Sequence, residues 1–317
     1  MEEVLSQKSN RAVFGLISLV VVFFIVLIIF SVYTVKVFKD SDKSSLSFGD
    51  KDGDKIAVIE VEGVIMESKK TVELLHRAEK DESSKAIILR INSPGGAVAP
   101  TQEIYNEIRR IDNEYTSSKG EKGKPIYSSF GSISASGGYY LGAATRKICA
   151  LPGTITGSIG VIMQFMDLSK LYEWAMVNPQ VVKAGRYKDI GQPNRALNEE
   201  EKALMDRMIA NVHNQFIDDV NRTRKDKIKG DIYEHAQGQI FSGEGAYKLG
   251  LVDELGSLWE CARGIHESLA LKGDMDLKYI KKKKKMRLVD YFSEIDEVTS
   301  TIKEILTSTK SPTLMYR

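Results

Sequence analysis

Hydrophobic and polar positions follow two different periods along this chain, and the periods divide most of it into strand-like and helix-like stretches. Short apolar runs rich in β-branched residues predict buried strands, and apolar residues spaced three and four apart predict amphipathic helices. The predicted strands are residues 55–65, 85–91, 125–130 and 180–183. The predicted helices are residues 71–82, 101–115, 168–174, 198–224, 242–249 and 257–271. Such alternation is typical of an α/β fold, in which βαβ units build a mainly parallel sheet.

The longest apolar stretch, from Ala12 to Val35, carries no charged residue. At about 1.5 Å per residue, a helix over this stretch crosses a hydrocarbon core of about 30 Å. It is longer than the roughly 7 to 15 apolar residues of a cleavable signal peptide. We therefore expect an uncleaved transmembrane anchor in membrane lipid, with residues 1–11 on the cytoplasmic side and a polar linker at 36–54. Positive charges on its two flanks are nearly balanced, so charge alone does not orient the anchor.

The predicted compact domain covers residues 55–273, and residues 274–317 read as a basic, amphipathic tail. This tail contains five consecutive lysines, Lys281 to Lys285, which indicate either a solvated segment or one attracted to anionic lipid. The net charge of +2 gives no reason to expect a nucleic-acid partner. Cys149 and Cys261 fit neither a metal-ligand spacing nor a disulfide framework, and Cys149 is expected to be a buried free thiol.

One serine stands in a setting suited to nucleophilic chemistry. Ser136 follows the strand predicted at 125–130 and a turn of small residues, and it precedes two glycines and an apolar run that predicts a helix. A serine at the first turn of a helix has unpaired backbone N–H groups beside it, which stabilise a developing oxyanion. Ser136 is therefore the candidate nucleophile.

The base that such a serine needs is not an obvious histidine. The chain has four histidines, none in a motif-like setting: His76, His213, His235 and His266. The alternative is a lysine that burial keeps neutral near the working pH. Lys188 lies in a loop punctuated by glycine and proline, KAGRYKDIGQP, which suits a residue that reaches into a site, although alone it reads as a surface lysine.

Two further strings contain candidate site residues. INSPGG, ending at Gly96, is either a simple β-turn or a glycine pair whose backbone amides approach a ligand closely. PGTITGSIG, starting at Pro152, is either a strand and loop or a source of a hydroxyl, from Ser158, that bonds a lysine amine.

Taken in order, INSPGG, SISASGGYY, PGTITGSIGVI and GRYKDIGQP resemble the bacterial signal peptide peptidases of the SppA family, single-repeat and membrane-anchored. The resemblance runs from about residue 55 to 271 and implies a Clp-protease/crotonase-like fold with no metal or other cofactor. It implies that Ser136 is the nucleophile, Lys188 the general base and Ser158 the hydroxyl that orients the lysine. Gly96 and Gly137 would offer N–H groups to the oxyanion, and the sequence does not separate Gly96 from Gly95.

The same resemblance implies a serine endopeptidase that hydrolyses extended, largely apolar peptides such as cleaved signal peptides. It also implies a ring of identical subunits with active sites at their interfaces, and a catalytic domain outside the cytoplasm, on the periplasmic side where there are two membranes. Two alternatives stay open at this point. One is a catalytically silent membrane scaffold of the same fold. The other is a crotonase-type acyl-CoA enzyme, which needs an acidic catalytic residue and which the anchor disfavours.

Overall fold

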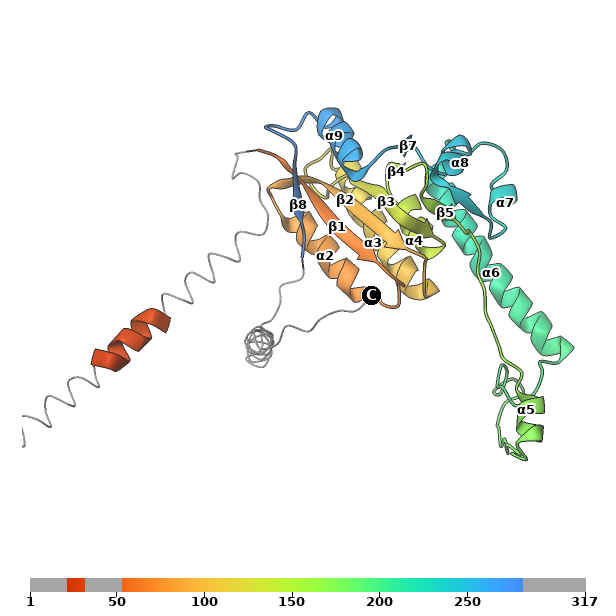
Figure 1. Ribbon diagram of the computed structural model, residues 1–317. Helices are drawn as coiled ribbons and strands as arrows, with labels where there is room; N and C mark the ends of the chain where they lie inside the picture. Colours follow the sequence, from red (N-terminus) through yellow and green to blue (C-terminus); the bar gives the residue numbers. More distant parts are fainter. Residues whose placement is uncertain (1–21, 32–52, 282–317) are drawn as a thin grey trace, which may run out of the picture. The chain divides into compact units, whose positions relative to one another are not determined.

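The computed structural model describes residues 22–31 and 53–281. Residues 22–31 form a helix with exposed side chains, and most of the expected anchor at 12–35, nearly all of the linker at 36–54 and the tail from residue 282 lie outside the described residues. Among the described helices, none has both the length and the apolar character that spanning a bilayer requires. The unit from Gly53 onward is described by itself below (Figure 1).

A mainly parallel sheet forms the centre of this unit (Figure 1). Its strands are β1 (Lys55–Glu62), β2 (Ser84–Ser93), β3 (Ile126–Ala135), β4 (Ile148–Ala150), β5 (Ile155–Gly157), β6 (Ile240–Ser242), β7 (Glu254–Leu255) and β8 (Asp276–Tyr279). The main path runs β6-β5-β3-β2-β1-β8, while β4 pairs with β3 and β7. Only the β5–β6 pair among these strands is antiparallel. The α/β prediction with a mainly parallel sheet is confirmed.

Helices cover the two faces of the sheet unequally. They are α2 (Lys69–Lys80), α3 (Val98–Ser117), α4 (Gly137–Ala143), α5 (Ser169–Trp174), α6 (Glu199–Arg224), α7 (Ile232–His235), α8 (Gly243–Lys248) and α9 (Leu258–Ser268). Ala57, Ile59 and Val61 of β1 pack in one core cluster with α2, α3, α4 and α6. Ile56 and Val58 point to the other face and pack in a cluster with α9 and β8. The period of two along β1 therefore places alternate residues in two separate cores.

Two differences from the sequence prediction concern chain segments at the edges of the fold. No strand forms at residues 180–183, where the backbone is irregular and exposed. Conversely, β8 lies within the expected tail and pairs in parallel with residues 55–58 of β1. The four residues of β8 give too short a pattern to be recognised next to a lysine run, but they extend the sheet by one strand.

The expectation of a free thiol at Cys149 is wrong, because Cys149 and Cys261 form a disulfide. Both residues are buried, and the bond joins β4 to α9 across the second core cluster. Their separation of 112 residues resembles no short disulfide motif. Only the packing of α9 on the sheet brings the two cysteines together, with Cα atoms 6.2 Å apart.

Candidate active site

Ser136 lies at the junction between β3 and α4, in a backbone conformation that few serines adopt. Its φ is 52° and its ψ is −119°, outside the regions favourable to L-residues. The conformation is held from both sides: the N–H of Ser136 donates to the carbonyl of Gly157, and its carbonyl accepts from the N–H of Tyr140. All seven residues of α4 are buried, so the element that follows the serine is fixed by packing. Strain held in this way is characteristic of functional positions, where it orients a reactive side chain.

The loop after β2 lies directly against Ser136. Gly95 has a φ of +106°, and a Cβ there would lie 2.8 Å from the Cβ of Ser136 and 2.8 Å from the amide nitrogen of Gly137. A Cβ at Gly96 would lie 2.1 Å from the carbonyl oxygen of Ile65. Both positions therefore require glycine, and the reading of INSPGG as a simple turn gives way to a close approach of two backbone segments.

Ser93 distinguishes the two glycine amides. Its buried hydroxyl accepts the N–H of Gly95 at 3.1 Å, so that amide already has a partner. The N–H groups of Gly96 and Gly137 donate no hydrogen bond within residues 53–281. The amides of Gly96 and Gly137 are thus free to donate within the described unit, whereas the amide of Gly95 is not, and this difference is due to Ser93, a residue that the sequence reasoning overlooked. Its signal was its place inside the INSPGG string.

A small pocket of about 30 Å³ opens beside these groups. Gly96, Ser136 and Gly137 form one side of it, with Tyr140 from α4. The other lining residues are mostly apolar and come from α3, the segment after β5, and α6: Val98, Thr101, Gln102, Gly160, Val161, Val212 and Phe216. None of the four histidines lines this pocket. An acyl group held at Ser136 would therefore lie against apolar side chains.

Ser158 and Lys188 differ in how the fold places them. Ser158 follows Gly157, whose carbonyl accepts the N–H of Ser136, so Ser158 lies next to the nucleophile's backbone partner. Its φ of 52° and its half-buried side chain suit a residue held for a purpose other than packing. Lys188 is exposed, and its amine makes no hydrogen bond or ion pair within residues 53–281. It is not among the residues that line the pocket at Ser136.

Lys188 belongs to an arm, residues 161–200, that leaves the sheet after β5 and carries α5 at its far end (Figure 1). The apolar side chains of this arm face solvent. Ile162 is 91% exposed, Trp174 82%, Met176 92% and Val182 101%. Exposed apolar side chains therefore recur along the length of this arm.

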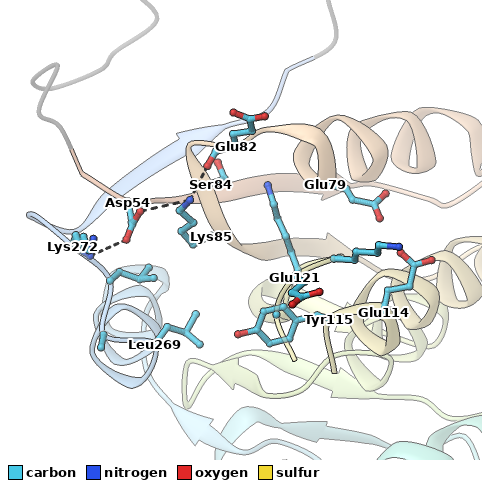
Figure 2. A pocket seen from close by; sticks show the side chains of 16 residues that line it. Asp54, Glu79, Glu82, Ser84, Lys85, Glu114, Tyr115, Glu121, Leu269 and Lys272 are labelled. Atoms are coloured by element: carbon cyan, nitrogen blue, oxygen red, sulfur yellow. Dashed lines mark hydrogen bonds and ion pairs between the residues drawn. The ribbon is translucent and has the colours of Figure 1, made fainter. Parts of the chain in front are cut away.

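A second cavity, of about 860 Å³, lies away from this chemistry (Figure 2). Its lining includes Asp54, Ser84 and Lys124, at or just before the first residues of β1, β2 and β3. Ser136 and Gly95 follow the last residues of β3 and β2. Because these strands are parallel, the cavity and Ser136 lie at opposite ends of the sheet. Its walls mix carboxylates with lysines, as Figure 2 shows for Glu82 and Lys85.

Comparisons with known proteins agree with this geometry. The model of peptidase family S49 matches residues 118–272, and that of Clp protease matches residues 55–124. A candidate protease of Synechocystis sp., slr0021, is 40% identical over 204 residues, which are 64% of this chain and 70% of that protein. A candidate signal peptide peptidase SppA of Enterococcus faecium is 34% identical over 182 residues, 57% of this chain and 50% of that protein.

Among solved structures, a membrane-bound stomatin-specific protease, 1510-N, in its S97A form, aligns with a TM-score of 0.46 at 14% identity. The alignment covers 74% of this chain and all of that one. The aligned segments span between half and about two thirds of the curated relatives named above. The mainly parallel sheet and the two family matches together define a serine peptidase with a Clp-protease-like domain. The chain belongs to peptidase family S49.

Proposed function

We propose that this protein is a membrane-anchored endopeptidase that uses Ser136 and Lys188 as a catalytic dyad and degrades extended apolar peptides, cleaved signal peptides among them. The observation that carries the proposal is the strained Ser136 facing two amides, of Gly96 and Gly137, that have no partner in the described unit. The apolar pocket beside Ser136 suits a small apolar side chain next to the scissile bond.

In the proposed reaction, the neutral amine of Lys188 takes the proton of the Ser136 hydroxyl as Oγ attacks the peptide carbonyl carbon. The amides of Gly96 and Gly137 donate to the oxyanion that forms. Collapse of this intermediate breaks the C–N bond, and the lysine returns its proton to the leaving amine. Water, deprotonated by the same lysine, then hydrolyses the Ser136 ester and releases the acid product. Ser158 accepts or donates a hydrogen bond that orients the amine.

We propose further that the lysine comes from a neighbouring copy of the chain. Within one chain Lys188 lies on the arm and outside the pocket at Ser136, and the arm exposes the apolar side chains that an assembly would bury. A ring of identical subunits satisfies both observations, because each arm then reaches the site of the next subunit.

The disulfide supports a location outside the cytoplasm. Disulfides persist in oxidising compartments and are rare in the reducing cytosol. A buried bond between Cys149 and Cys261 fits a domain that folds beyond the cytoplasmic membrane, held there by the proposed anchor at residues 12–35. The location on the periplasmic side, where the cell has two membranes, is part of the same proposal.

The test is hydrolysis of a fluorogenic apolar peptide by the full chain in detergent, with wild type compared with Lys188→Ala and Ser136→Ala. Both variants should lose activity by at least about 10³-fold. Mixing the two inactive variants should restore part of it, because a mixed assembly contains sites with both Ser136 and Lys188 intact. Wild-type activity in Lys188→Ala would end the dyad proposal.

Labelling distinguishes the enzyme from a silent scaffold of the same fold. A fluorophosphonate should label Ser136 in the assembled wild type, and Lys188→Ala should slow the labelling. An assembled, folded sample that takes up no label at Ser136 would support the scaffold instead.

A further inference from the structure

The arm that carries Lys188 differs from an ordinary protein segment in which of its side chains are buried and which are exposed. Of residues 161–200, Asp189 alone is buried, at 6% exposure. The next buried residue is Glu201, at 2%, in the first turn of α6. Acidic side chains are rarely buried unless they are paired. The one buried residue of this arm is thus charged, whereas Ile162, Trp174, Met176 and Val182 face solvent.

Asp189, the immediate neighbour of Lys188, is held by cations from both sides. Its Oδ1 accepts from the amine of Lys183 and lies 3.0 Å from a terminal nitrogen of Arg195. Its Oδ2 accepts from the Nε of Arg195 at 3.2 Å. Hydrogen bonds from Arg195 and Lys183 lower the pKa of Asp189 to about 2, so its side chain is ionised at neutral pH.

Arg195 continues the network to the start of α6. Its two terminal nitrogens donate to the two carboxylate oxygens of Glu201, at 2.7 and 2.6 Å. Glu201 also accepts the N–H of Asn198, whose side chain accepts the N–H of Glu201, which completes a capping box. One guanidinium therefore ties the Lys188 loop to a capped helix end.

We propose that Asp189, Arg195 and Glu201 form a clamp that positions Lys188 before the neighbouring subunit is engaged. The inference rests on the proposed role of Lys188 as the base. The loop of residues 185–192 contains no buried apolar residue, and its backbone forms a series of turns, in which the N–H of Lys188 donates to the Gly185 carbonyl and the N–H of Gln192 donates to the Asp189 carbonyl. Planar, bidentate ion pairs fix geometry more firmly than single contacts. The clamp residues are positioning residues, because they act through Lys188.

The clamp leads to a specific kinetic signature. Asp189→Asn and Arg195→Lys should lower kcat by roughly 10- to 10²-fold, the cost of a base displaced by about an ångström. KM should stay within about twofold, because Asp189, Arg195 and Glu201 do not line the pocket, to which the arm contributes only Val161 at its start. Glu199→Gln removes the same charge from the same helix turn, at an exposed residue without an ion pair in the described unit, and should keep the wild-type kcat.

The decisive measurement adds Asp189→Asn to Lys188→Ala. If the clamp acts through the lysine, the double variant should be no slower than Lys188→Ala alone. A further tenfold or greater loss of activity in the double variant would refute the clamp and indicate a purely structural role. A fall in kcat that only parallels loss of assembly, measured by light scattering, would refute it as well. If Asp189→Asn fails to assemble, Arg195→Lys decides, and a wild-type kcat in that variant overturns the inference. A failure of the dyad itself is seen separately, as activity retained in Lys188→Ala.

Discussion

Reduction of the Cys149–Cys261 bond should destabilise the domain strongly without changing its fold. The bond closes a loop of 112 residues, and the chain-entropy relation for cross-links gives about 4.8 kcal/mol of stabilisation for a loop of that size. For a domain of this length, that corresponds to a fall in Tm of roughly 10 to 20 °C. The loop closed by the disulfide contains helix α6 and the whole Lys188 arm, so the cross-link restricts much of the unfolded chain.

The assay is urea unfolding of the oxidised and reduced protein, followed by circular dichroism. Reduction should lower the midpoint, and the dependence on urea should steepen, because the unfolded chain without the cross-link exposes more surface. Cys149→Ala/Cys261→Ala is the control, since its unfolding should not respond to reductant. A difference below about 1 kcal/mol between the two states would refute the entropic argument. Alkylation of both thiols in the folded, unreduced protein would refute the disulfide itself.

Three further outcomes are expected. Gly95→Ala should reduce kcat/KM by at least about 10²-fold, because the added methyl group meets the nucleophile and its φ is strained, while Gly153→Ala, with no atom within 4 Å of its Cβ, should keep activity. Ser93→Ala removes the hydroxyl that accepts the Gly95 N–H, and kcat should fall about tenfold with KM unchanged. A wild-type kcat would show that this hydrogen bond does not order the loop of Gly95 and Gly96 for catalysis. The buried Arg224 forms an ion pair with Asp253 at 3.0 Å. Burial tends to raise the pKa of Asp253, but the charge and hydrogen bonds of Arg224 outweigh it and lower that pKa, so this ion pair stabilises the fold above about pH 4 and loses this effect as pH falls through the lowered value. Asp253→Asn should cost about 3 to 5 kcal/mol at pH 7 in urea unfolding and much less at pH 2, and equal losses at both pH values would contradict the assignment.

Most of the fold could be predicted because the chain repeats a strong local signal. The helices at 71–82 and 198–224 and the strand at 85–91 were predicted within a few residues of α2, α6 and β2. These elements are long enough for their apolar period to show. The strands β4, β6, β7 and β8 have four residues or fewer, and such short stretches become strands only through pairing partners distant in the sequence.

The residues of the candidate site also divide into those that the sequence could suggest and those that it could not. Ser136 could be proposed as the nucleophile because it combines a strand, a small-residue turn and a helix start within a few positions. Ser93 and Asp189 could not be assigned roles, because each acts through a contact that exists only after folding. The disulfide was missed for the same reason, since nothing in the spacing of Cys149 and Cys261 shows that α9 packs beside β4. The placement of Lys188 and Ser158 against Ser136 stays a prediction.

The pocket beside Ser136 has two walls of different character. One wall is α4, whose residues are all buried and hold the nucleophile in its strained backbone. The other includes Val98 and Gln102 of α3 and Val212 of α6, which are all at least partly exposed. Substitution of these three residues changes the shape offered to a substrate without disturbing the core. Substitutions in α3 and α6, whether engineered or acquired as related peptidases diverge, can therefore change peptide specificity without changing the chemical step.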